Sequence, residues 1–95
     1  MPFRHIVLLT LDDTCEVEAL VDDLRTMATG IPSIRRYEVG RDVGVSDGNA
    51  TVAVVADFDD QAGWELYRDH PAHVAFIADR IKPHLLARTA VQHAT

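Results

Sequence analysis

The chain is predicted to form one α+β domain over residues 1–95, with a four-stranded antiparallel sheet and all helices on one face of it. Four short segments rich in Val, Ile and Leu favour strands, and the segments between them carry apolar residues at helical spacing. Their order is strand, helix, strand, strand, helix, helix, strand. A chain of 95 residues with 47% hydrophobic content has room for one core and is apolar enough to build it.

Composition excludes several classes of partner. The formal net charge is −6 and the longest basic run is Arg35-Arg36, so nucleic acid and anionic membrane surfaces are not expected to bind. The longest apolar stretch, Ile6 to Leu11, is too short to cross a bilayer. Cys15 is the only cysteine, which excludes an intrachain disulfide and a thiolate metal cluster. We expect a cytoplasmic protein.

The first strand and helix follow from residues 3–29. Phe3 to Leu11 reads as a strand, and a helix from about Glu16 carries one apolar stripe, made of Val17, Leu20, Val21, Leu24 and Met27. Asp13 paired with Glu16, or alternatively Thr14, is expected to cap its start. Gly30 is expected to end it.

The centre of the chain predicts a hairpin. Residues 34–43 alternate in polarity, with Tyr37 and Val39 on one face, and their polar character suits a sheet edge. Residues 51–58 are dominated by Val and Ala and read as the partner strand. Asp47-Gly48 between them is a strong turn signal.

The last third predicts two helices and a strand. Asp59 or Asp60 can cap a helix that carries Trp64, Leu66 and Tyr67. This helix should break before Pro71, which can start the next one. The second helix has apolar residues at helical spacing, namely Val74, Ile77, Ala78 and Ile81. Lys82-Pro83 should close it, and residues 85–93 read as the fourth strand.

This β-α-β-β-α-α-β order is typical of a ferredoxin-like fold with right-handed crossovers. The segments Ile6–Leu9 and Val52–Ala56 are apolar on both faces, yet helices on one side can cover only one of them. We therefore expect a homodimer in which two sheets pack face to face about a twofold axis.

Three segments resemble the stress-responsive dimeric α/β-barrel (Dabb) family over essentially the whole chain. They are Arg4-His5-Ile6-Val7-Leu8, then Ile31-Pro32-Ser33-Ile34 followed by Glu38-Val39-Gly40-Arg41-Asp42, and Tyr67-Arg68-Asp69-His70-Pro71-Ala72-His73-Val74. The resemblance implies a dimer whose two sheets form a barrel-like core. It implies no single activity, since the family includes stress proteins and also olivetolic acid cyclase, which closes a polyketide ring by aldol condensation without a cofactor.

The resemblance to this cyclase suggests which residues carry chemistry. Aldol condensation needs a base beside a carbonyl and a donor that holds the enolate oxygen. The matching positions are His73 and Tyr67 as catalytic residues and His5 as a cavity-lining residue. Trp64 and Phe76 are expected as pocket walls.

Each of these residues also has a structural interpretation. Tyr67 and His73 suit a packed aromatic and a hydrogen-bonded histidine, and His5 suits a satisfied core histidine. Trp64 and Phe76 equally suit core or interface aromatics. His70 precedes Pro71 and is expected to cap the helix break, so it is left out of the catalytic set.

This chain departs from the pattern of the Dabb family at Gln92-His93, where many family members carry Asp-Tyr. A carboxylate would stabilise a charged histidine beside it, whereas Gln92 can orient a histidine only through a neutral amide.

A three-histidine metal site made of His5, His70 and His73 is not favoured, because the motifs of zinc hydrolases are missing and the spacing is weak evidence. No glycine-rich phosphate loop is present, and no metal or organic cofactor is predicted. The leading hypothesis is a dimer that binds a small, carbonyl-bearing or polyketide-like ligand and supports acid–base chemistry. The alternatives are a non-enzymatic stress-responsive or scaffold dimer and a cofactor-free monooxygenase.

Overall fold

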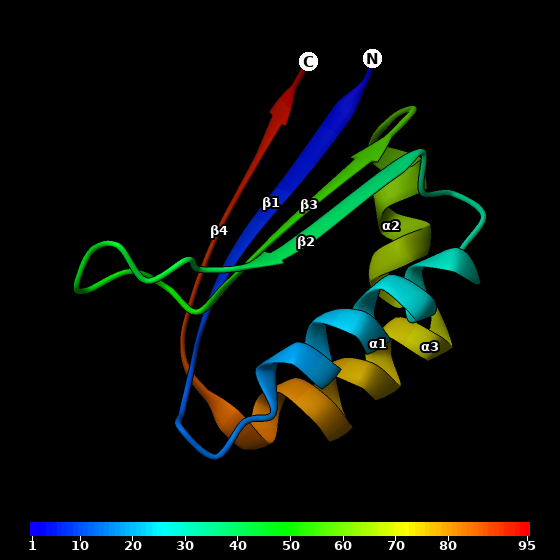
Figure 1. The fold of residues 1–95 in the computed structure, drawn as a ribbon. Coiled ribbons are helices and arrows are strands. Elements are labelled where there is room, and N and C mark those ends of the chain that lie inside the picture. The colour runs from blue at the N-terminus through cyan, green and yellow to red at the C-terminus, as the bar shows by residue number, and fades with distance from the viewer.

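The computed structural model describes residues 1–95 and has the predicted order of elements. These are β1 (Phe3–Leu11), α1 (Val17–Thr29), β2 (Arg36–Arg41), β3 (Val52–Phe58), α2 (Gln61–Asp69), α3 (Pro71–Phe76), a π turn (Ile77–Ile81), a 3₁₀ turn (Lys82–His84) and β4 (Leu85–Ala94). The strands form one antiparallel sheet in the order β2-β3-β1-β4, so β2 is an edge strand as expected. The helices lie on one face of this sheet (Figure 1). The ferredoxin-like prediction is confirmed.

Strand alternation decides which side chains meet the helices. Along β1 every second residue from His5 to Leu11 is buried, because successive side chains of a strand point to opposite faces. The facing stripe of α1 is also buried, and its members are Val17, Leu20, Val21 and Leu24. Leu20 of α1 and Val52 of β3 are the most deeply buried large side chains of the core that the helix and the sheet build.

The predicted cap of α1 is wrong. Glu16 occupies the N-cap position without a side-chain hydrogen bond, and neither Asp13 nor Thr14 caps the helix. Asp12 instead accepts hydrogen bonds from the backbone N–H and hydroxyl of Thr14, at 3.1 and 2.7 Å. The imidazole of His84 also contacts both side chains, so this cluster ties the β1–α1 loop to the start of β4.

The break between α2 and α3 is built as predicted. Asp60 caps α2 by accepting a hydrogen bond from the Gly63 N–H at 2.9 Å. His70 ends α2 with extended backbone angles, which are the angles that a following proline favours. Its Nδ1 then accepts the Ala72 N–H at 3.1 Å and caps α3, so His70 has the structural role expected of it.

The apolar stripe expected on α3 is only partly correct. Val74 is 53% exposed and Ala78 is also exposed, whereas Ile77 is half-buried and Ile81 is buried. The helix is rotated so that His73 faces the sheet and Val74 faces outward. A π turn follows, in which the Lys82 N–H bonds the Ile77 carbonyl, and it changes the helical phase before Ile81.

The sheet face opposite the helices is uncovered in Figure 1. Leu8 of β1 and Val91 of β4 lie on it and are 41% and 54% exposed. The β2–β3 loop projects beyond the sheet, and it turns at Gly44 and Gly48, both of which have the positive φ that glycine tolerates. None of the helices has the length and apolar character needed to cross a bilayer.

Candidate functional site

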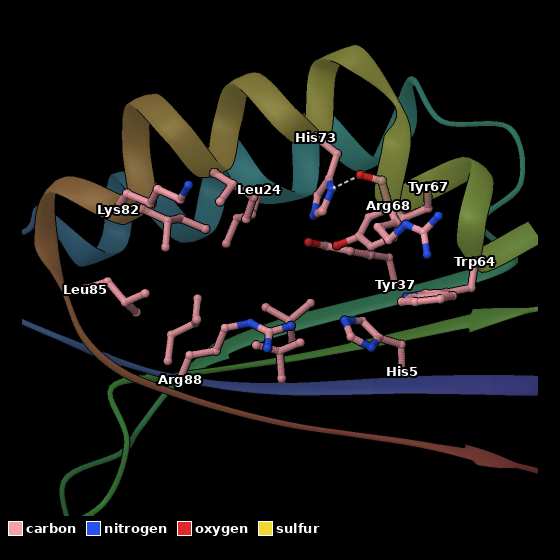
Figure 2. Close-up of a pocket in the computed structure, with 15 residues that line it drawn as sticks. His5, Leu24, Tyr37, Trp64, Tyr67, Arg68, His73, Lys82, Leu85 and Arg88 are labelled. Atoms are coloured by element: carbon pink, nitrogen blue, oxygen red, sulfur yellow. Dashed lines mark hydrogen bonds between the residues drawn. The ribbon is translucent and has the colours of Figure 1, made fainter.

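A cavity of about 360 Å³ lies between the sheet and the helices (Figure 2). Its walls are His5, Val7, Leu9, Leu24, Tyr37, Val54, Trp64, Tyr67, Arg68, His73, Ile77, Ile81, Lys82, Leu85 and Arg88. Antiparallel pairing with inward-facing residues of β1 places Arg88, Ala90 and Gln92 on the inner face of β4. None of these three is a large apolar side chain, so β4 does not fill the space above it.

Tyr67 and His73 come together at the break between α2 and α3. Their ring centroids are 4.1 Å apart with 36° between the ring planes, and both side chains line the cavity. The break at Pro71 allows this contact, because it lets the two short helices meet at an angle. Tyr67 is buried, and burial raises the pKa of its hydroxyl, which therefore stays protonated and can donate a hydrogen bond.

The tautomer of His73 follows from its backbone contact. Its Nδ1 lies 3.1 Å from the Arg68 carbonyl oxygen, which can only accept, so Nδ1 carries the proton. The lone pair is then on Nε2, the ring nitrogen on the cavity side in Figure 2. Burial lowers the pKa of His73, and the Arg68 carbonyl opposes this effect. The imidazole is therefore held neutral and can accept a proton at Nε2.

His5 presents the complementary tautomer. The side-chain amide nitrogen of Gln92 lies 3.0 Å from its Nδ1 and donates to it, which leaves the proton on Nε2. Gln92 thus orients a histidine, as its amide suggested, but that histidine is His5 and not His73. Burial, with a smaller contribution from the charge of Arg88, lowers the pKa of His5 to about 4. His5 is a neutral donor at physiological pH.

Tyr37 is a cavity residue that sequence reasoning did not select. Its hydroxyl is buried, makes no hydrogen bond of standard geometry, and faces the hydroxyl end of Tyr67 in the cavity (Figure 2). Burial and the neighbouring Tyr67 raise its pKa, so it too is a protonated phenol. The alternation that places Tyr37 on the face of Val39 was the available signal, but it does not tell which helix lies opposite.

The structure places Trp64 and Phe76 in different surroundings. Trp64 lines the cavity, with its ring centroid 5.9 Å from that of His5 and the Arg68 guanidinium 5.0 Å above its ring. Phe76 does not line the cavity, so its assignment as a pocket wall is wrong. It packs against the main core instead, because the rotation of α3 that turns His73 inward places Phe76 beside the core, under Arg80.

The histidines considered for a metal do not form one cluster. His5 and His73 line the same cavity, but His70 is not a lining residue and its Nδ1 is occupied by capping α3. The structure contains no group of three or more His, Cys, Asp or Glu side chains placed to hold an ion.

The cavity therefore combines one proton acceptor with several donors. His73 Nε2 is the acceptor, and the hydroxyls of Tyr37 and Tyr67 and the Nε2–H of His5 are the donors. Arg88 and Lys82 add positive charge, which the sequence analysis did not anticipate. An apolar chamber with few convergent polar groups of this kind is the usual form of a small-molecule site.

Two comparisons with known proteins identify the same kind of domain. A family model described as the stress responsive A/B barrel domain matches residues 3–93. A stress-response A/B barrel domain-containing protein of Arabidopsis thaliana is 25% identical over 79 residues, which cover 80% of this chain and 71% of the relative.

Two solved structures relate the fold to known proteins. A dimeric ferredoxin-like protein of unknown function from Thermobifida fusca is 41% identical, with a TM-score of 0.89 over 100% of this chain and 92% of the other. A hydroxynitrile lyase from Passiflora edulis is 17% identical, with a TM-score of 0.83 over 99% of this chain and 94% of the lyase. The second likeness shows the fold alone.

Proposed function

The chain belongs to the stress responsive A/B barrel (Dabb) family, and from that premise we propose that it binds a small, mostly apolar, carbonyl-bearing ligand in its cavity and supports cofactor-independent acid–base chemistry there. His73 is the proposed base and Tyr67 the proposed donor. The observation that carries this proposal is that both rings lie in one cavity with their centroids 4.1 Å apart. The lone pair of His73 is directed into that cavity.

The polar groups suit proton abstraction beside a carbonyl. His73 Nε2 takes a proton from the ligand's α-carbon, the electron pair of that C–H bond forms the enolate C=C bond, and the π pair of the carbonyl moves onto its oxygen. The Tyr67 hydroxyl holds this oxygen by a hydrogen bond. In an aldol step the enolate carbon then bonds to a second carbonyl carbon, whose oxygen takes the proton back from His73. The proton that His73 takes up is returned in this step, and no oxidant or reductant is needed.

The non-enzymatic dimer remains the rival, because the same residues could serve packing alone. Two features favour chemistry over packing. The buried Tyr37 hydroxyl makes no hydrogen bond of standard geometry although it faces the Tyr67 hydroxyl, and a bound ligand would supply a better partner. The Arg68 carbonyl fixes His73 in the tautomer that a base needs.

We also propose that the protein is a homodimer formed by the uncovered sheet face. Leu8 and Val91 on that face are exposed in the single chain, and the 41% identical relative from Thermobifida fusca is dimeric. A stable interface of this kind buries about 1,200–2,000 Å² in total. Such an interface leaves the cavity, on the other face, open to a ligand. A cytoplasmic location is proposed as well, and cell fractionation would test it.

Proton abstraction can be measured without knowing the natural ligand. Acetophenone is a small apolar ketone, and exchange of its methyl protons for deuterium in D₂O is followed by NMR. We expect the protein to accelerate this exchange, His73→Ala to abolish the acceleration, and Tyr67→Phe to reduce it by ~10²-fold because one oxyanion donor is lost.

His70→Asn is the matched control. His70 lies outside the cavity and asparagine retains its capping role, so this variant should exchange acetophenone like the wild type. The scaffold interpretation predicts no acceleration by the wild type. It also predicts that His73→Ala lowers the free energy of unfolding by ~1–3 kcal/mol with no activity to lose.

A further inference from the structure

Two cations facing the cavity lack a carboxylate partner. Seven of the nine Lys and Arg side chains form ion pairs with Asp or Glu, and these are Arg4, Arg25, Arg35, Arg36, Arg41, Arg68 and Arg80. The two exceptions are Lys82 and Arg88, and both line the cavity. In a chain of formal charge −6 with 15 acidic residues, this arrangement is notable because partners are plentiful elsewhere.

Arg88 owes its position to strand register. It pairs with Leu9 of β1, a buried inward-facing residue, so the Arg88 side chain leaves β4 on the helix side of the sheet. Figure 2 shows it lying along the cavity floor toward His5, with Lys82 and Leu85 at the same end. Arg88 stays solvent-exposed at this position, since β4 is an edge strand, and its charge is available to a ligand that enters the cavity.

The cavity walls contain no acidic residue at all. Ten of the 15 lining residues are hydrophobic, and the charged ones are Arg68, Lys82 and Arg88. Arg68 is paired with its neighbour Asp69, which leaves Lys82 and Arg88 as uncompensated positive charges next to an apolar chamber. Both side chains are solvent-exposed in the single chain, and with no carboxylate beside them they can pair with an anion that enters with the ligand.

We propose that the ligand of this cavity carries a carboxylate, which Arg88 binds with Lys82 nearby. This inference rests on the proposed function, because it takes the same cavity as the ligand site and specifies its substrate class as a keto acid. The planar guanidinium of Arg88 matches a carboxylate in a two-pronged contact.

The layout of the cavity orients such a ligand. Lys82 and Leu85 occupy one end, Tyr67, His73 and Trp64 occupy the other, and the Arg88 side chain runs along the floor from the first end toward His5 (Figure 2). A keto acid with its carboxylate at Arg88 therefore places its carbonyl toward His73 and Tyr67, with apolar atoms between the two groups. The charge of Arg88 also acts on both cavity histidines, since it lowers the pKa of His5 and of His73.

A carboxylate is favoured over a phosphate by the rest of the lining. The cavity has no glycine-rich loop, and its walls are mostly apolar side chains that cannot donate to three phosphate oxygens. A singly charged, planar group attached to an apolar body fits both the guanidinium and the chamber. Phenyl phosphate is the probe that separates these two anions.

The test compares acids with their methyl esters. Levulinate, para-acetylbenzoate and β-benzoylpropionate are keto acids of increasing size, and each has a neutral methyl ester of nearly the same shape. We expect NMR or calorimetric titration of the full chain to show that the acid of at least one pair binds about 10-fold or more tightly than its ester. Added salt should weaken binding of the acid and leave the ester unaffected.

Variants locate the contact. Arg88→Gln should weaken binding of the acid by about 10- to 100-fold and leave the ester unchanged, and Arg88→Lys should restore part of the loss. Arg80→Gln is the matched control, since Arg80 pairs with Asp23 and does not line the cavity. Unfolding curves of all three variants show whether the fold is retained.

The outcomes separate this inference from the proposed function. If esters bind as well as acids, or Arg88→Gln leaves the preference for acids intact, the carboxylate site is wrong and the ligand cavity stands. If phenyl phosphate binds more tightly than every acid, the site takes phosphate and the carboxylate assignment is overturned. If no acid, ester or phosphate binds, both this inference and the proposed ligand cavity fail.

Discussion

Protonation of His5 should make the fold sensitive to mildly acidic pH. His5 is 4% exposed, and burial lowers its pKa from 6.5 to about 4. The unfolded chain has the ordinary value, so as the pH falls through 6.5 the unfolded chain takes up a proton that the folded chain refuses. The contribution of neutral His5 to the free energy of unfolding is therefore fully present above pH 6.5. It is lost progressively as the pH falls to about 4.

The size of this loss follows from the two pKa values. Between about pH 7 and about pH 5 the linkage relation gives a loss of about 2 kcal/mol from this one group. Water at the cavity mouth screens an imidazolium, so we expect a measured loss of about 1–2 kcal/mol. Most carboxylates stay ionised in this range and contribute less.

The assay is urea unfolding at fixed protein concentration, performed at both pH values on the wild type and on His5→Gln. Glutamine can still contact Gln92 but cannot titrate, so the variant should lose about 1–2 kcal/mol less than the wild type on acidification. His70→Asn, which leaves the cavity intact, should behave like the wild type. Equal pH dependence in the wild type and His5→Gln would refute the assignment of a suppressed pKa to His5.

Three further predictions concern the interface, the cavity and a helix cap. Leu8→Glu should give a monomer in sedimentation experiments, because it places like charges across the proposed interface, while Val45→Glu on the exposed loop should leave the dimer intact. Tyr37→Phe should change the free energy of unfolding by no more than ~1 kcal/mol, since its hydroxyl makes no hydrogen bond of standard geometry; a loss above ~2 kcal/mol would reveal one. Asp60→Ala should destabilise α2 by ~1 kcal/mol in thermal or urea unfolding, and Asp60→Asn, which still accepts the Gly63 N–H, should be nearly neutral.

Local patterns in the sequence were sufficient for the order of elements. The run from Phe3 to Leu11, the stripe on α1 and the proline at position 71 each act through neighbours within a few residues, so they are readable without tertiary information. The cap of α1 was misjudged because Asp12 and Thr14 are engaged by His84, which is 70 or more positions away in the chain. Similarly, the apolar spacing on α3 did not reveal that a π turn shifts its phase.

Some residues of the candidate site were likewise indicated by the sequence, and others could be recognised only from the fold. The segment from Tyr67 to Val74, through its resemblance to the Dabb family, marked Tyr67 and His73. The structure brings these rings into contact, and their catalytic role stays a prediction. Alternation in β2 and β4 could have placed Tyr37 and Arg88 on the inner face, but not in one cavity. That requires knowing that β4 pairs with β1 and that α2 and α3 lie above them.

The sequence by itself therefore determined the element order, the inward faces of the strands and the break at Pro71, because each depends on backbone preferences and side-chain periodicity close along the chain. Only the tertiary structure decided that the Nδ1 of His73 is engaged by the Arg68 carbonyl, that Phe76 lies outside the cavity, and that Arg88 faces it without a carboxylate partner. These outcomes depend on side chains from separate strands and helices meeting in space, and burial and charge act on a residue through whatever meets it.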